Sequence, residues 1–182
     1  MLEINLSIVI FLPLAAGLIG AFLPARLARW VALAGALAVL AYVVVMVADY
    51  DARVTGLHYV TDAAWIPELG VRYTVGIDGL NLFLVALTAL LWVPAILLAA
   101  TGPLEHPRLF FFHMALAETA VLGAFCAQDL ALFVVFFDLM LVPFYFLVGG
   151  WGGAGRVAAT LKLVIYTPVS YTHLTLPTIC SV

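Results

Sequence analysis

Charged side chains are scarce in this sequence of 182 residues. Only 9% of the residues are Asp, Glu, Lys or Arg, whereas soluble domains carry about 25%. Hydrophobic residues make up 66% and the mean hydropathy is +1.22, which is typical of an integral membrane protein. The formal net charge of −3 gives no reason to expect nucleic-acid binding. We therefore expect the lipid bilayer as the surroundings of the chain.

Cysteines are also few, and no basic segment precedes the first apolar run. The two cysteines, Cys126 and Cys180, lie far apart and do not form the spacing of a metal or redox site. We expect no metal site and interpret Cys126 as a small apolar helix residue. The first apolar run is preceded by Glu3 instead of basic residues, and it is longer than the core of a signal peptide. It is predicted to be a transmembrane helix that remains in the mature protein.

Long apolar runs, by contrast, are abundant. A helix needs about 20 mostly apolar residues to cross a bilayer. The sequence predicts an all-α polytopic membrane protein with about six transmembrane helices, near residues 4–24, 30–48, 80–100, 109–127, 130–149 and 157–167. Residues 49–79 form a loop that alternates apolar and polar residues. The alternation favours a short surface hairpin leading to an Asp-Gly turn at Asp78-Gly79, with an irregular cap as the alternative.

The arginines indicate an orientation. Two groups lie on opposite sides of the predicted bundle: Arg26, Arg29, Arg108 and Arg156 on one, and Arg53 and Arg72 on the other. Because loops inside the cell are enriched in Lys and Arg, this distribution places the N-terminus outside.

One carboxyl group interrupts the fifth apolar run. Asp138 is eight residues from the start of that run, roughly 12 Å into the hydrocarbon. A central Asp costs about 3 kcal/mol, and the surrounding Leu, Val and Phe residues favour insertion by about 6 kcal/mol. Acids at such depth face a bundle interior or a water-filled path, and we expect this of Asp138. Pro143 cannot donate to the carbonyl of Leu139, which loosens the backbone beside the acid. Both a proton-handling acid and a neutral structural one fit these residues.

Two further ionisable residues lie within predicted helices. Glu118 is near mid-depth in the fourth, and Lys162 is roughly 8 Å from the inside end of the sixth. Either Lys162 extends to the inner surface, or Glu118, Asp138 and Lys162 begin a chain of titratable groups through the bilayer. His113 lies about 140° around the helix from Glu118, so we predict a polar contact for it instead of a proton relay.

A glycine-rich motif follows the fifth helix. Residues 150–155 spell G-x-G-x-x-G, but the dinucleotide site with that pattern needs a preceding strand within a βαβ unit. We interpret these residues as a flexible inside turn and expect no nucleotide site.

Several motifs together resemble one family. FDLMLVP at residues 137–143, ending in GGWG at 149–152, resembles the fifth-helix signature of subunit M of bacterial NADH-quinone oxidoreductase, respiratory complex I. GIDGL at 76–80, AATLK at 158–162 and YT at 166–167 also fit. The resemblance covers residues 1 to about 167 and implies an N-terminal, truncated part of an antiporter-like fold of about fourteen helices with two inverted repeats.

The resemblance also implies roles for the buried charges. In that family the fifth-helix acid is usually Glu and works with a lysine on the seventh helix. The acid maps to Asp138, whose side chain is one methylene shorter. Glu118 occupies a position where an acid appears in similar sequences. Lys162 belongs to the sixth helix and is not the seventh-helix lysine.

The implied function is proton translocation by a multi-pass subunit of the bacterial cell (inner) membrane. NADH oxidation and quinone reduction, with NADH, FMN, iron–sulfur clusters and quinone, would belong to partner subunits of the complex, and this chain would hold no redox centre. The alternatives are a subunit of a multisubunit sodium/proton antiporter, or an inactive membrane fragment.

The last residues differ in composition from the rest. Residues 168–182 are polar and rich in threonine, and they are not predicted to complete the sixth helix. We expect the membrane domain to comprise residues 1–167 and the segment 168–182 to be non-native sequence, with a genuine divergent tail as the alternative.

Overall fold

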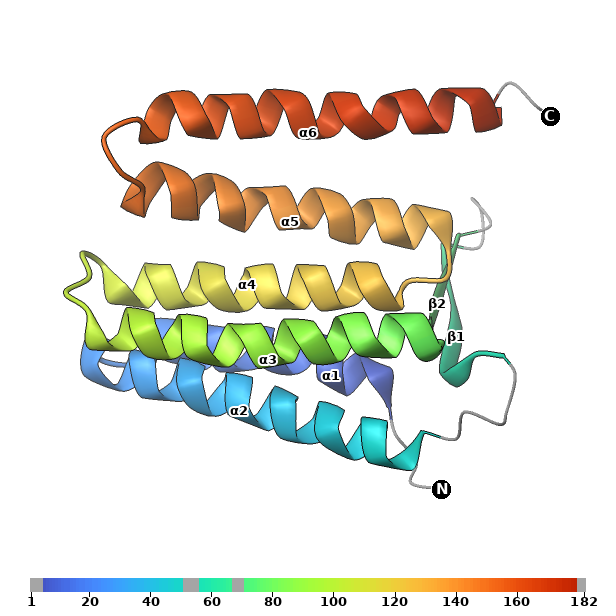
Figure 1. Ribbon diagram of the computed structural model, residues 1–182, viewed down its shortest axis with the longest axis horizontal. Coiled ribbons are helices and arrows are strands. Elements are labelled where there is room, and N and C mark those ends of the chain that lie inside the picture. The colour runs from blue at the N-terminus through green and yellow to red at the C-terminus, as the bar shows by residue number, and fades with distance from the viewer. Residues whose placement is uncertain (1–4, 51–55, 67–70, 180–182) are drawn as a thin grey trace.

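The computed structural model describes residues 5–50, 56–66 and 71–179 of the chain. These residues form six helices and one two-stranded sheet (Figure 1). In chain order the elements are α1 (Leu6–Phe22), α2 (Ala25–Asp49), β1 (His58–Ile66), β2 (Val71–Ile77), α3 (Gly79–Thr101), α4 (Pro107–Cys126), α5 (Leu130–Trp151) and α6 (Arg156–Ile179). Each of the six predicted helices is therefore confirmed.

Side-chain caps determine where three of the helices begin. Asn5 accepts a hydrogen bond from the backbone N–H of Ser7, and Asp129 accepts from those of Ala131 and Leu132. Such oxygens satisfy N–H groups that have no partner within the helix. Asp78 accepts in the same way at the start of α3, at 2.7 Å. The expectation of an Asp-Gly turn at Asp78-Gly79 is therefore wrong, because the Asp78 side chain caps a helix there.

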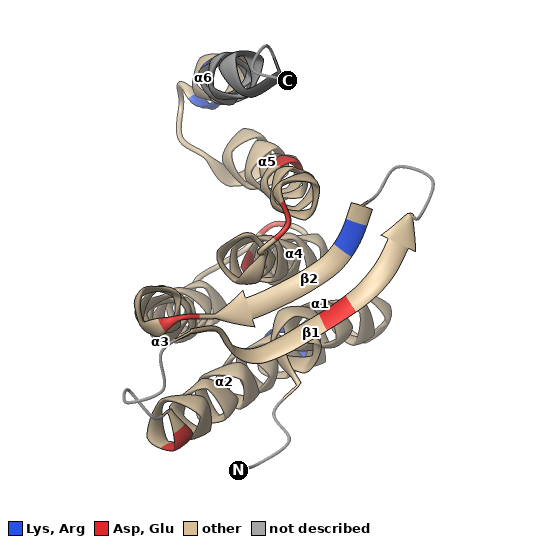
Figure 2. Ribbon diagram, turned by 90° about the vertical axis from the view of Figure 1, so that its right-hand side faces the viewer, with Lys and Arg blue, Asp and Glu red and all other residues tan. Residues whose placement is uncertain are grey.

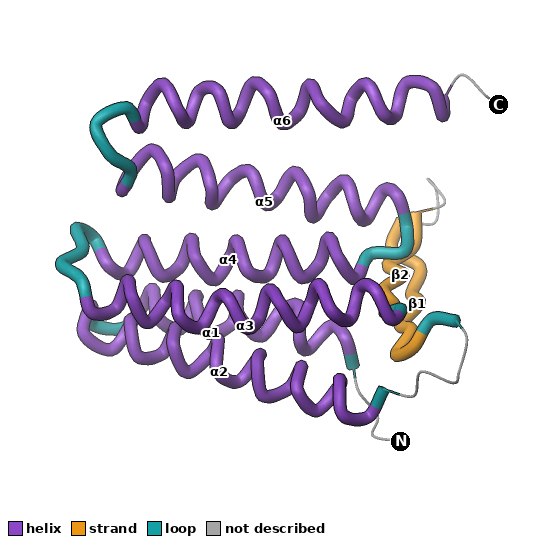
Figure 3. Tube along the Cα trace, viewed as in Figure 1, coloured by secondary structure: helices purple, strands orange, loops and turns teal. Residues whose placement is uncertain are grey.

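The predicted hairpin is confirmed and closes one end of the bundle (Figure 3). β1 and β2 pair antiparallel, with Asp62 opposite Thr74. On the bundle side of β2, Val75 and Ile77 are fully buried. Gln128, between α4 and α5, donates from its backbone N–H to the Thr74 carbonyl and from its side chain to the Gly76 carbonyl. The hairpin is thereby fastened to the connection that positions α5.

Small residues bring the first four helices close together. α4 packs against α1, α2, α3 and α5. A Cβ at Gly17 of α1 would lie 2.5 Å from Ala115 Cβ of α4, and one at Gly35 of α2 would lie 2.6 Å from Ala16 Cβ of α1. Helix packing in membranes relies on such close backbone approach.

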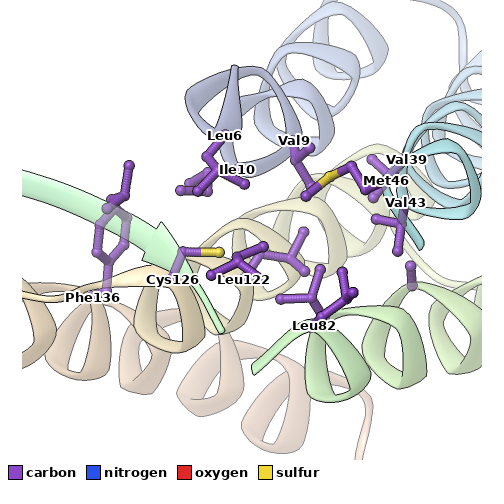
Figure 4. Close-up of a cluster of buried hydrophobic side chains, with 14 of the residues drawn as sticks. Leu6, Val9, Ile10, Val39, Val43, Met46, Leu82, Leu122, Cys126 and Phe136 are labelled. Atoms are coloured by element: carbon purple, nitrogen blue, oxygen red, sulfur yellow. The ribbon is translucent and has the colours of Figure 1, made fainter. Parts of the chain in front are cut away.

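The largest buried cluster lies between these helices and the hairpin (Figure 4). Its labelled members are Leu6, Val9, Ile10, Val39, Val43, Met46, Leu82, Leu122, Cys126 and Phe136. Cys126 is fully buried, which confirms its interpretation as an apolar helix residue.

Among the described residues, four helices are long and apolar enough to cross a membrane: α2, α3, α4 and α5. α1 is also apolar but has 17 residues. α6 differs from the prediction, because the helix continues past residue 167 to Ile179.

Candidate functional site

Glu118 is a carboxyl group within the helical bundle. Its residue is 1% exposed, and its Oε1 atom has no hydrogen-bond partner among the described residues. The adjacent Thr119 is fully buried, and its Oγ1 atom likewise has no partner there. A buried polar atom without a partner costs about 1–3 kcal/mol. Packing alone therefore gives no reason for an acid at this position.

The sequence of α4 explains why Glu118 is buried. Phe111, Ala115, Glu118 and Leu122 recur at helical spacing and are all buried. They follow one side of α4, and Ala115 on this side approaches Gly17 of α1. Because α4 is surrounded by other helices, an acid on this side cannot reach the surface.

Asp138 does not lie in the interior of these helices. Its residue is exposed on α5, whereas the buried residues of α5 are Leu132, Phe136 and Pro143. The ring of Phe136 fits against Gly123 of α4, which fixes the packing side of α5. Asp138 follows Phe136 by two residues, about 200° around the helix. The expectation that Asp138 faces the interior is therefore wrong for the described helices.

Lys162 is exposed on α6. Among residues 156–167, the part of that helix whose burial is described, Thr160 is buried, and it packs against Gly149 of α5. Thus the structure places Glu118 inside the bundle and leaves Asp138 and Lys162 on exposed parts of two neighbouring helices. Figure 2 shows how few charged residues the helices carry.

A cavity that the sequence analysis missed lies between α4, α5 and α6. Its volume is about 510 Å³, and its lining includes His113, Tyr145, Gly149, Trp151 and Thr160. The sequence feature that could have indicated this cavity is the spacing of Tyr145 and Gly149, which share one side of the fifth helix with Asp138.

His113 makes the polar contact that was predicted for it. Its Nδ1 atom lies 2.7 Å from the carbonyl oxygen of Leu109, and its ring centroid is 4.9 Å from that of Phe146.

The arginines occupy the two ends of the bundle as predicted. One group lies at the end opposite the hairpin: Arg26, Arg29, Arg108 and Arg156. Arg72 lies in the hairpin, and Arg53 is outside the described residues. At the first end Arg29 donates to the carbonyl of Ala100, and Arg156 donates to that of Gly150. Residues 150–155 join the end of α5 to the start of α6 and follow a helix, unlike the strand that a dinucleotide site requires.

Comparisons with known proteins agree with this arrangement. Residues 127–180 match the transmembrane family described as NADH:quinone oxidoreductase/Mrp antiporter. The chain is 34% identical to F(420)H(2) dehydrogenase subunit M of Methanosarcina mazei, over 90% of this chain and 33% of that protein. It is 34% identical to NADH-quinone oxidoreductase subunit M of Rhodobacter capsulatus, over 89% of this chain and 32% of that protein. Over about 90% of its length the chain is therefore similar to antiporter-like membrane subunits of this family.

Solved structures show the same fold. A chain of respiratory complex I from Thermus thermophilus superimposes with a TM-score of 0.78 and 26% identity, over 90% of this chain and 33% of that one. The archaeal membrane-bound sulfane sulfur reductase gives a TM-score of 0.69 at 12% identity and shares the fold. The chain spans about a third of the length of the curated relatives it matches. The division at residue 167 stays a prediction.

Proposed function

We propose that the protein represented by this chain is the proton-translocating subunit M of an NADH-quinone oxidoreductase. The observation that carries the proposal is a buried carboxyl group, Glu118, on α4, the helix before the one that carries Asp138, in a chain similar to these membrane subunits. Partner subunits would hold NADH, FMN, iron–sulfur clusters and quinone, and this chain would hold no redox centre. The remaining membrane subunits of the complex would be its neighbours in the bilayer.

The proposed chemistry is movement of protons among the carboxyl groups of Glu118 and Asp138 and the amine of Lys162. A carboxyl group away from water favours its neutral form, and a nearby cation favours the carboxylate. Moving a cation toward or away from Asp138 therefore releases or loads a proton. We assign this role first to Asp138, and we assign the neighbouring steps to Glu118 and Lys162.

The proposal extends to placement in the membrane. The end that carries four arginines would face the inside of a bacterial cell, which puts the N-terminus outside and the hairpin on the outer surface. The electron donor would depend on the partner subunits, because similar relatives are named for NADH, NAD(P)H and F(420)H(2).

A second candidate is a subunit of a sodium/proton antiporter. The description of the matching family, which includes the Mrp antiporter, favours it. In that case cation exchange would proceed without electron transfer, and a sodium gradient would drive proton movement in vesicles that receive no electron donor.

The test uses the full-length subunit with this sequence, assembled in its complex in membrane vesicles. Asp138→Asn removes the titratable group, and Asp138→Glu keeps it. We expect proton uptake per electron transferred to be lost in the Asn variant and retained in the Glu variant. Asp129→Asn is the matched control, since Asn still caps α5. Normal proton uptake in Asp138→Asn would overturn the proposal, and uptake driven by sodium alone would favour the antiporter.

A further inference from the structure

Two cavities adjoin where α4 begins, at the end of the bundle opposite the hairpin (Figure 1). The smaller has a volume of about 360 Å³ and is lined by the first residue of α2 and by residues at the start of α4: Ala25, His106, Pro107, Arg108 and Leu109. The larger is the cavity of about 510 Å³ between α4, α5 and α6, and Leu109 belongs to its lining as well. The two cavities therefore meet at one side chain.

The smaller cavity is basic. Arg108 in its lining is exposed, and its guanidinium group makes no hydrogen bond or ion pair with another of the described residues. Arg26, also exposed, follows the lining residue Ala25 directly in the chain. The nearest acid in the chain, Glu105, does not belong to the lining. Because a guanidinium group offers donors that match phosphate oxygens, this cavity is complementary to a phosphate group.

The larger cavity is mostly apolar. Two of its polar groups are already bonded to the backbone: the indole N–H of Trp151 donates to the Glu105 carbonyl, and the hydroxyl of Thr160 donates to the Arg156 carbonyl. Trp side chains are enriched at the membrane–water boundary, so Trp151 indicates the depth at which this cavity begins. Apolar side chains from all three helices line it, among them Leu109, Phe146, Val157 and Leu161. Such a lining is complementary to a hydrocarbon chain.

We propose that the two cavities together bind one anionic phospholipid of the monolayer at this end of the bundle. The phosphate group lies in the basic cavity beside Arg108, and an acyl chain extends past Leu109 into the apolar cavity. The inference goes beyond the proposed function and does not depend on proton movement.

Charge and depth together favour this occupant. Pro107 and Arg108 begin α4 at the membrane surface, and His113 in the larger cavity lies six residues beyond Pro107, about 9 Å along the helix axis. The basic cavity is thus at the level of lipid headgroups, and the apolar cavity extends toward the hydrocarbon. A free phosphate ion would use the first cavity alone, and an uncharged lipid would use the second alone.

The experiment uses the full-length subunit with this sequence, assembled in its complex in lipid nanodiscs. The probe is phosphatidylglycerol with a photoreactive group on its acyl chain, and peptide mass spectrometry locates the adducts. We expect adducts on the segments that line the apolar cavity, residues 109–113 and 145–161, and fewer from phosphatidylcholine with the same acyl chain. Arg108→Gln should lower adduct formation from phosphatidylglycerol about fivefold, the factor for one Arg near an anionic membrane surface.

Three further variants separate the headgroup from the acyl chain. Arg72→Gln removes the same charge at the hairpin end and should leave the adducts unchanged. Gly150 lines the apolar cavity, and an added Cβ there meets nothing within 4 Å, so Gly150→Leu should fill the cavity and abolish the adducts. Gly153→Leu is its matched control, because Gly153 is equally open but lines neither cavity.

Two results would overturn the proposal. Equal adducts from the two lipids, with no loss in Arg108→Gln, would mean that the apolar cavity takes any acyl chain and that no phosphate group is recognised. Adducts that form in the isolated subunit but not in the assembled complex would mean that a partner subunit covers the cavities. Proton uptake in the Asp138 variants tests the proposed function separately, and neither of these two results bears on it.

Discussion

The helices α1–α4 and the pair α5–α6 differ in how closely they are packed. In the most apolar stretch of α4, 56% of the residues are buried, against 17% in α5. The first region is close-packed through glycines, and its carboxyl group, Glu118, is buried. In the second region α6 packs chiefly on α5, and both Asp138 and Lys162 are exposed. The proposed proton-handling groups thus lie on both sides of a boundary between a close-packed region and an open one.

The contact that joins the two regions should be the most sensitive to substitution. A Cβ at Gly123 would overlap the ring of Phe136. We expect Gly123→Leu to lower the free energy of unfolding by about 3 kcal/mol, the upper range for overpacking. Denaturation of the purified protein in detergent micelles measures this. The double variant with Phe136→Ala should recover part of the loss, and a double variant no better than Gly123→Leu would contradict the contact.

The sequence predicted the six helices because each apolar run is long and bounded by polar or glycine residues. It also predicted the hairpin, because alternation of apolar and polar residues has a period of two. It did not predict which side of α5 packs inward. Asp138 was expected to face the interior on the basis of its charge, whereas the side is decided by Phe136 against Gly123, a contact between residues on two helices. The extent of α6 was missed because residues 168–182 are polar and rich in threonine, which gave no apolar run to follow beyond residue 167.

Removal of the buried acid should raise the free energy of unfolding, whereas Gly123→Leu should lower it. Glu118→Met keeps a side chain of similar length and removes an oxygen that has no partner among the described residues. We expect the free energy of unfolding to rise by about 1–3 kcal/mol, while proton uptake by the assembled full-length protein falls. The same denaturation measurement and the vesicle assay check the two effects. A variant that is both less stable and fully active would show that Glu118 has a structural role.

Two glycines test the difference in packing directly. We expect Gly35→Ala in α2 to cost about 1 kcal/mol, since its Cβ would lie 2.6 Å from that of Ala16. Gly150 in α5 has open space around it, with nothing within 4 Å of an added Cβ. There the same substitution should stabilise the helix by about 0.5–1 kcal/mol, because alanine loses less conformational freedom. Paired thermal denaturation curves measure both, and equal effects would contradict the contrast between the two regions.

The smallest expected effect concerns the hairpin, outside the membrane helices. Hydrogen bonds from Arg72, at 2.7 and 2.8 Å, and from Thr74 hold the pKa of Asp62 below its ordinary value of 3.8. A lowered folded-state pKa means that the pair contributes stability above pH 3.8, and that this contribution is lost as the pH falls through the folded-state pKa. Because both side chains are exposed and solvent screens the pair, we expect only a slight change in stability. The carbon-13 resonance of the Asp62 carboxyl group, followed by NMR, should titrate with a midpoint at lower pH than that of a free Asp. In Arg72→Gln we expect this midpoint to move to higher pH. An unchanged midpoint in that variant would mean that the backbone pairing of β1 and β2, and not the ion pair, holds this end of the hairpin together.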